Sequence, residues 1–277
     1  MAAPIMDYST VLVTGADAYH FSNLKVLIGS WKVNNPTLPL CVCDFGFSTD
    51  QIEILKRIEG VFYLPNNGTI FSHPWEGKAA IVDFLKGYKH PYEVLVWIDA
   101  DALFASPYPH LPELMKGYDM IIDPHINSIA EIMHECNREV LHVNKEDCYF
   151  SAGCWIARRG VLLETYQRLT QLVKGKGNLW ECDAFVAGIY HEKLNLRRVD
   201  GGVWHSRGKT SLETCTVKDL KAYHNGGLIY VLHANANYTV RSDGRRIFDR
   251  PELAAIQDHY EAYFINHVAN LCLPSKS

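Results

Sequence analysis

The sequence has no excess of charge of one sign. Its 27 Lys and Arg residues stand against 31 Asp and Glu residues, which gives a net charge of -4 over 277 residues. Because the two signs are mixed along the chain, no basic stripe is available to neutralise the phosphates of a duplex. We therefore expect no nucleic acid partner, and any bound polyanion needs a local site.

Long apolar runs are also missing. No uninterrupted apolar stretch approaches the ~18 residues needed to cross a bilayer, and no N-terminal basic and apolar signal is visible. These absences predict a cytoplasmic protein without a transmembrane segment. In that location the two glycosylation sequons, at Asn67 and Asn237, are expected to be accidental.

The cysteines lack the spacing of a zinc site. The chain has 8 of them, and Cys41 and Cys43 lie on an expected buried strand whose geometry does not favour a bridge between them. We expect buried thiols.

The chain has enough apolar residues for a sizeable core, with 48% hydrophobic and 12% aromatic content. Short apolar strands alternate with amphipathic helices. A helix capped by Ser22 follows the first strand, a helix opened by a Ser48-x-x-Gln51 capping box follows the second, and a third helix is expected at about 76–87. This alternation predicts an α/β protein with a mostly parallel sheet covered on both faces.

Two aspartates, Asp99 and Asp101, end the apolar strand in YEVLVWIDADALF. A chain of this length is expected to contain about one Asp-x-Asp by chance, so the context has to support any role. Residues two apart on an extended segment point to the same side, and ligands of parallel sheets bind beyond the carboxyl ends of the strands. The pair therefore fits Mn²⁺ or Mg²⁺ bridging to a diphosphate. Capping of the next segment, or pairing with an arginine, is the alternative.

Five segments in chain order give a family resemblance. They are VLVTGADAYHFSNLKVLIGSWKVNNP, GKAAIVDFLKGYKHPYEVLVWIDADALF, YFSAGCWIARR, LWECDAFVAGIY and IYVLHANANY. Together they resemble glycosyltransferases of the GT-A fold, and family 8, the glycogenin-like retaining enzymes, in particular. The resemblance implies a Rossmann-like, mostly parallel central sheet flanked by helices in residues 1–240, which form the nucleotide-sugar-binding and catalytic domain. Residues 241–277 are expected to form a C-terminal helical extension, whose apolar stripe could pack on its own domain, form a homodimer contact or touch a membrane-associated acceptor.

The resemblance assigns the donor-binding residues. Asp17 would accept a hydrogen bond from uracil and Tyr19 would stack on it, although a turn with a packed tyrosine is the alternative. Lys78 would pair with the donor or with Asp101, unless it is simply solvated. Asp99, Ala100 and Asp101 would face the donor, and His233 would complete the metal site with the two aspartates. Ser151 and Gly153 would lie under the hexose, or alternatively form a strand with a bulge.

The sequence departs from the family at two places. After His233 the family has a glycine and a phosphate-binding lysine, where this chain has Ala236 and Thr239. Arg241, Lys209 or Arg207 would have to supply the missing cation.

The second departure lies in LWECDAF, where Ala184 replaces the amide of the family's Asp-Gln. Asp183 is our choice for the carboxylate nearest the reacting carbon, with helix capping as the alternative role. Glu181 is the alternative carboxylate, as a base on the acceptor side.

These features predict a metal-dependent hexosyltransferase. It would move a hexose from a nucleotide-sugar, a UDP-sugar in the first instance, to a hydroxyl of a carbohydrate, glycolipid or protein acceptor, with retention of configuration. A sugar nucleotidyltransferase would show a glycine-rich basic loop after the first strand, which TGADAYHFSN lacks. A non-catalytic sugar-binding module would need neither the aspartate pair nor a metal.

Overall fold

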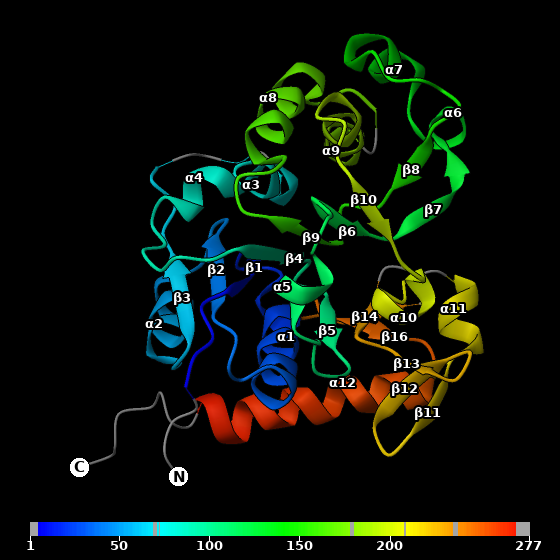
Figure 1. Ribbon diagram of the computed structural model, residues 1–277. Helices are drawn as coiled ribbons and strands as arrows, with labels where there is room; N and C mark the ends of the chain where they lie inside the picture. Colours follow the sequence, from blue (N-terminus) through cyan, green and yellow to red (C-terminus); the bar gives the residue numbers. More distant parts are fainter. Residues whose placement is uncertain are drawn as a thin grey trace.

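A seven-stranded sheet forms the centre of the protein (Figure 1). The structure, a computed structural model, describes residues 5–68, 71, 73–177, 180–207, 209–234 and 238–269. The strand order is β10-β6-β9-β4-β1-β2-β3. All neighbours in this sheet are parallel except β9, which runs antiparallel to β4 and to β6. The strands are β1 (Thr10–Ala16), β2 (Leu40–Asp44), β3 (Val61–Leu64), β4 (Val94–Ile98), β6 (Met120–Ile122), β9 (Cys154–Arg158) and β10 (Leu196–Arg198). The predicted mostly parallel sheet is confirmed.

Alternating side chains of the central strands enter two different cores. On β1, Val11 and Val13 belong to one buried cluster and Leu12 belongs to another. Since successive strand residues point to opposite faces, both faces of the sheet are buried, as the continuous apolar runs predicted. Cys41 and Cys43 share one of these cores as free thiols, so the expectation of buried thiols is confirmed for them.

Helices cover both faces of the sheet (Figure 1). In this view α3 (Pro74–Ala79), α4 (Ile81–Leu85), α8 (Leu163–Val173) and α9 (Trp180–His191) lie above it. Below it lie α1 (Phe21–Asn34), α2 (Thr49–Arg57) and α12 (Pro251–Tyr263), which continues into η1 (Phe264–Ala269). Shorter helices complete the described chain: α5 (Leu111–Leu114), α6 (Ile129–Ile132), α7 (Glu135–Leu141), α10 (Gly201–Trp204) and α11 (Lys209–Thr214). None of the described helices is both long enough and apolar enough to span a membrane.

The predicted helix starts are partly corrected. The capping box at Ser48 is present, with Gln51 as its partner. The predicted cap at Ser22 is wrong, because α1 already begins at Phe21 and His20 precedes it without a side-chain cap bond. The single helix expected at about 76–87 is two helices, because Ala80 leaves the helical conformation between α3 and α4.

Short strand pairs lie beside the central sheet. The strand β5 (Ala102–Phe104) pairs with β14 (Val231–His233), and β7 (Pro124–Ser128) pairs with β8 (Cys148–Phe150). A small antiparallel sheet contains β11 (Thr216–Lys218), β12 (Lys221–His224) and β13 (Gly227–Leu228). The hairpin of β15 (Tyr238–Val240) and β16 (Arg246–Phe248) leads into α12.

The C-terminal helix packs on α1. The Nδ2 of Asn34 donates to the hydroxyl of Tyr260 over 2.8 Å, and a Cβ on Gly29 would lie 2.2 Å from the carbonyl oxygen of Tyr260. Arg250 precedes α12, and no side chain caps the helix. The division between residues 240 and 241 stays a prediction, and the β15–β16 hairpin pairs residues on its two sides.

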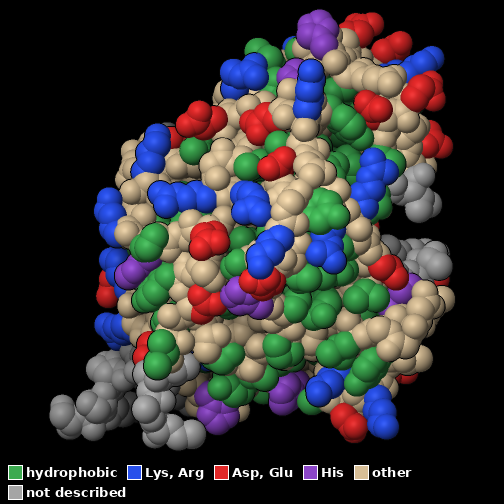
Figure 2. Space-filling view, viewed as in Figure 1, with side chains coloured by type: hydrophobic (Ala, Val, Ile, Leu, Met, Phe, Trp, Pro, Cys, Tyr) green, Lys and Arg blue, Asp and Glu red, His purple; other side chains and the backbone are tan. Residues whose placement is uncertain are grey.

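Charged side chains are mixed over the visible surface. On the face shown in Figure 2, Lys and Arg lie scattered among Asp and Glu without forming a continuous basic band.

Candidate active site

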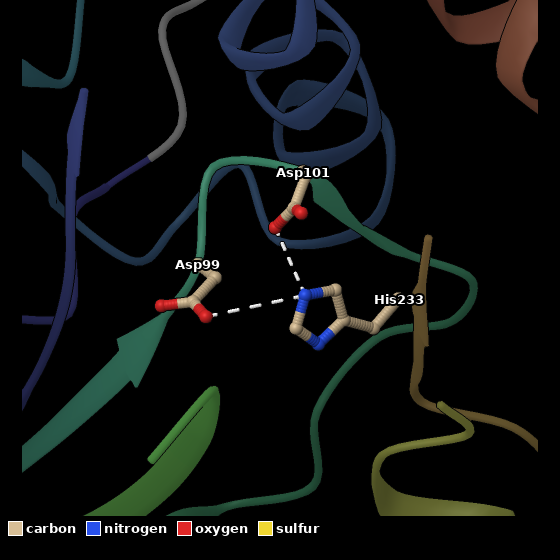
Figure 3. A group of neighbouring side chains, drawn as sticks. All are labelled: Asp99, Asp101 and His233. Carbon is tan, nitrogen blue, oxygen red and sulfur yellow. Dashed lines mark hydrogen bonds and ion pairs between the residues drawn. The ribbon is translucent and has the colours of Figure 1, made fainter. Parts of the chain in front are cut away.

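Asp99, Asp101 and His233 meet at the end of β4. Asp99 follows the last residue of that strand, and Asp101 directly precedes β5. The pairing of β5 with β14 sets His233 opposite Ala102, which brings its ring to the aspartates. Nε2 of His233 lies 2.9 Å from Oδ1 of Asp101 and 3.9 Å from Oδ2 of Asp99 (Figure 3). We call these three residues the Asp-Asp-His group.

The Asp-Asp-His group fits a divalent cation. One ligand atom from each residue lies within 4.8 Å of the others. Two carboxylates and an imidazole are a suitable donor set for Mn²⁺ and leave room for substrate oxygens. Gly153 keeps the space beside the group open, because a Cβ there would lie 2.9 Å from Cε1 of His233 and 3.2 Å from Oδ2 of Asp99.

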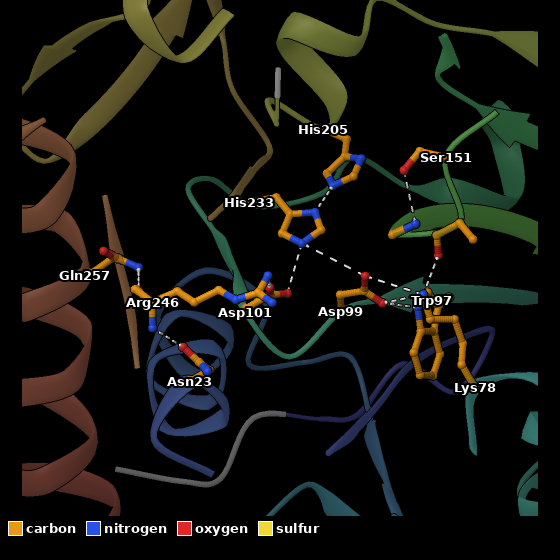
Figure 4. Close-up of polar contacts among 12 residues, drawn as sticks. Asn23, Lys78, Trp97, Asp99, Asp101, Ser151, His205, His233, Arg246 and Gln257 are labelled. Carbon is orange, nitrogen blue, oxygen red and sulfur yellow. Dashed lines mark hydrogen bonds and ion pairs between the residues drawn. The ribbon is translucent and has the colours of Figure 1, made fainter. Parts of the chain in front are cut away.

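A second histidine, His205, supports His233 from behind. Nε2 of His205 lies 2.8 Å from Nδ1 of His233, so the Nε2 of His233 remains directed at the two aspartates (Figure 4). Burial, together with the neighbouring His233, lowers the pKa of His205 well below its usual range. A neutral imidazole that bonds to the other ring nitrogen fixes the tautomer and orientation of a metal-binding histidine. His205 could not be predicted from the sequence, because nothing in VWHSRG signals that a backbone bridge from Ser206 to Leu232 carries it to β14.

Asp99 is held by groups behind the site. Nε1 of Trp97 donates to its Oδ1 over 2.8 Å, and Nζ of Lys78 lies 3.1 Å from the same oxygen. Nζ of Lys78 also lies 3.4 Å from Oε1 of Glu181. Burial would lower the pKa of Lys78, but Asp99 and Glu181 outweigh it and raise the pKa above its usual range. Burial raises the pKa of Asp99 even though Lys78 acts to lower it.

Asp101 carries a different partner. Its Oδ2 accepts from Nη1 of Arg246, a residue of β16 that was not among the residues predicted from the sequence. Burial would raise the pKa of Asp101, but His233 and Arg246 outweigh it and hold the pKa well below its usual range. Asp101 is therefore an ionised carboxylate at neutral pH.

A cavity of about 340 Å³ lies in front of the Asp-Asp-His group. Most of the residues chosen from the sequence line it, namely Lys78, Asp99, Ala100, Asp101, Ser151, Gly153, Glu181 and His233. Further lining residues include Ala16, His20, Phe45, Trp75, Trp97, Cys182 and Arg246. The cavity lies beyond the carboxyl ends of β1 and β4, where ligands of parallel sheets bind.

Asp17 and Tyr19 are not among the residues that line the cavity. Oδ1 of Asp17 lies 2.7 Å from Nδ1 of His20, and it is His20 that faces the cavity. Tyr19 is 59% exposed and packs its ring over Gly244. The segment chosen from the sequence therefore borders the site through His20.

Asp183 also lies outside the cavity lining. Its Oδ1 accepts from the Tyr149 hydroxyl over 2.8 Å, and its Oδ2 accepts from Nδ2 of Asn137 over 2.7 Å. Burial raises the pKa of Asp183. In the first turn of the same helix, Glu181 faces the cavity and accepts from the Tyr166 hydroxyl.

The cations chosen from the sequence lie elsewhere. Arg207 pairs with Asp123 over 3.3 Å, and the exposed Arg241 lies near Asp243. Neither belongs to the cavity lining. The side chain of Lys209 and the whole of Ala236 lie outside the described residues.

The comparisons with known proteins identify the fold. No family model matches the sequence, and no curated protein matches it significantly. A crystal structure of the galactosyltransferase LgtC with donor and acceptor sugar analogues has a TM-score of 0.55 at 12% identity, covering 91% of this chain and 94% of LgtC. An active-site mutant of LgtC gives 0.53 at 13% identity, covering 80% and 86%. The apo structure of WbbM, a bifunctional glycosyltransferase, gives 0.58 at 13% identity, covering 95% of this chain and 50% of WbbM. These neighbours show that this chain has the GT-A fold of glycosyltransferases.

Proposed function

We propose that this protein is a metal-dependent glycosyltransferase that transfers a hexose from a UDP-sugar to an acceptor hydroxyl. The observation that supports this proposal is the Asp-Asp-His group, which lines a cavity of about 340 Å³. A cavity of this size, with a few converging polar groups, is typical of a small-molecule site. The structural neighbours LgtC and WbbM are themselves glycosyltransferases, which favours this use of the fold.

The Asp-Asp-His group would hold Mn²⁺ or Mg²⁺. Bound there, such an ion would act as a Lewis acid toward the departing diphosphate. The surrounding residues set the charge and orientation of the three metal-binding side chains. Asp101 is ionised, Trp97 and Lys78 orient Asp99, and His205 orients His233.

The nucleoside is proposed to lie beside Ala16, His20 and Phe45. The Phe45 ring fits closely against the backbone there, since a Cβ on Gly15 would lie 2.2 Å from it and a Cβ on Gly77 would lie 2.4 Å from it. An aromatic wall suits a base, and the polar ring of His20 offers a hydrogen bond. Asp17 would then act by orienting His20.

The sugar is proposed to lie between Gly153, Ser151 and Glu181. Cleavage at the anomeric carbon develops positive charge on the ring, and a carboxylate beside the ring stabilises it. Glu181 faces the cavity and takes this role in place of Asp183. Retention of configuration, which the family resemblance implies, is part of the proposal and is read from the anomeric proton of the product.

A donor screen tests the function. Purified protein with Mn²⁺ is given a panel of UDP-, GDP- and dTDP-sugars, with and without a mixture of sugar acceptors, and released nucleotide is measured. We expect release from a UDP-sugar, loss of release with EDTA, and loss in Asp101→Asn. The exposed α2 variant Asp50→Asn is the matched control and should behave as wild type.

The other outcomes point to the rival functions. Sugar binding that ignores both UDP and Mn²⁺ would indicate a non-catalytic module. Formation of nucleotide-sugar from a sugar phosphate and a nucleoside triphosphate would indicate a nucleotidyltransferase.

A further inference from the structure

Arg246 lines the cavity from a part of the chain outside the five segments of the family resemblance. Its Nη1 donates to Oδ2 of Asp101, and its guanidinium lies 4.8 Å from the centre of the Tyr238 ring. Figure 4 shows the side chain reaching from β16 across to the Asp-Asp-His group. The side chain is 28% exposed, so it is open to the cavity on one side.

The backbone of Arg246 is fixed on both sides of β16. Its N–H donates to Oδ1 of the buried Asn23 over 2.8 Å, and its carbonyl accepts from Nε2 of the buried Gln257 over 2.9 Å. Nδ2 of Asn23 also donates to the carbonyl of Gly244 over 3.2 Å. These bonds tie the β15–β16 hairpin to α1 and α12, so only the side chain of Arg246 is free to change partner.

The two cations of the cavity are placed differently. Among the described lining residues, Lys78 and Arg246 are the Lys and Arg side chains. Lys78 is 8% exposed and lies against Asp99, Glu181 and the carbonyl of Ala152. It is fully occupied behind the site. Arg246 has one carboxylate partner in the cavity, and that partner is Asp101 of the Asp-Asp-His group.

The charges of the residues that line the cavity favour binding of the cation before the diphosphate. Three carboxylates, Asp99, Asp101 and Glu181, outnumber the two cations, so a diphosphate would be repelled from the cavity on its own. A divalent cation on Asp99 and Asp101 reverses that balance. It also competes with Arg246 for Asp101, which leaves the guanidinium available for another anion.

We propose that Arg246 binds the diphosphate of the nucleotide donor, exchanging its pairing with Asp101 for phosphate oxygens once the Asp-Asp-His group holds its cation. The planar guanidinium suits bidentate recognition of phosphate. This inference rests on the proposed function. Arg246 would then supply the positive charge toward the diphosphate for which the sequence offered Arg241, Lys209 or Arg207. The hairpin brings it to the site, since Val240 of β15 pairs with Arg246 of β16.

Calorimetry with Mn²⁺-saturated protein tests the inference. The probes are uridine, UMP and UDP, which share a nucleoside and differ in phosphate. The proteins are wild type, Arg246→Gln, Arg246→Lys and, as the matched control, Arg241→Gln, which changes an exposed arginine of the same hairpin outside the cavity. Mn²⁺ affinity is measured separately by electron paramagnetic resonance.

We expect Arg246→Gln to weaken UDP binding by about ten- to a hundred-fold while uridine binding stays within about twofold. Arg246→Lys should recover part of the loss, and Arg241→Gln should match wild type. Mn²⁺ affinity should be tighter in Arg246→Gln, because a competitor for Asp101 is gone, and retained Mn²⁺ binding also shows that the site has folded.

Two results would overturn the inference while leaving the proposed function standing. One is UDP affinity in Arg246→Gln within twofold of wild type, and the other is an equal loss of uridine and UDP affinity. A wild-type protein that binds no UDP with Mn²⁺ would overturn both.

Discussion

Two carboxylates in the first turn of α9 have different surroundings. Glu181 faces the cavity, whereas Asp183 is 1% exposed and bonded to Asn137 and Tyr149. In the sequence, Asp183 stands at the position of the family's aspartate, and Glu181 is the alternative carboxylate two residues before it. The pattern could not separate them, because which side of a buried helix meets a ligand depends on the partners across the fold.

Asp183→Asn and Glu181→Gln should therefore affect different properties. In Asp183→Asn the amide can still accept from Asn137, and the Tyr149 hydroxyl can reverse to accept from the new NH₂, so we expect about 1 kcal/mol lower stability and turnover within about twofold. Glu181→Gln should lower kcat by about a hundred-fold, since it removes charge beside the sugar. Urea unfolding and steady-state kinetics measure both. A larger kcat loss in Asp183→Asn than in Glu181→Gln would return the catalytic role to Asp183.

Asp123 should make the stability of the protein depend on pH. Burial raises its pKa to about 6, although Arg207 acts to lower it. A raised carboxyl pKa contributes stability that is present below the unfolded pKa, 3.8, and is lost as the pH rises through 6.

The free energy of unfolding of wild type, minus that of Asp123→Asn, should accordingly fall by about 2 kcal/mol between pH 4 and pH 7, at about 1.4 kcal/mol per pKa unit. Urea unfolding at several pH values measures it. A difference that rises over this range would mean that the ion pair with Arg207 outweighs burial.

At the scale of elements, local signals were predictable and packing-dependent ones were not. The Ser48 capping box is a contact between residues three apart, and it is present. The start of α1 depends instead on Phe21, which is buried beside Phe47 with ring centres 5.9 Å apart, so the helix extends past the expected Ser22 cap. Packing of this kind leaves no local signature.

The contact between α1 and α12 is close enough to test. A Cβ on Gly29 would lie 2.2 Å from the backbone oxygen of Tyr260, which cannot move without shifting α12. We expect Gly29→Ala to lower stability by about 1–3 kcal/mol despite the higher helix propensity of alanine. Gly188→Ala is the control, because the nearest atom there, 2.6 Å away, is the end of the Leu162 side chain. Thermal unfolding should show the larger loss for Gly29→Ala, and equal losses would contradict a backbone-limited contact.

On the scale of the whole molecule, the site is assembled from segments far apart in the chain. Asp99 and Asp101 could be predicted because they end an apolar strand, and His233 because the family resemblance places a metal-binding histidine in IYVLHANANY. His205 and Arg246 carry no such mark. They arrive through a single bridge to β14 and through the pairing of β15 with β16, and these contacts are visible only in the folded chain.

The central claim is that the Asp-Asp-His group binds a divalent cation on which donor binding depends. It is tested most directly by titrating UDP into wild type and Asp101→Asn by calorimetry, each with saturating Mn²⁺ and again with EDTA. The account predicts that Mn²⁺ strengthens UDP binding to wild type by at least about tenfold and has little effect on Asp101→Asn. Equal UDP affinity of wild type in Mn²⁺ and EDTA, or an undiminished Mn²⁺ effect in Asp101→Asn, would contradict it.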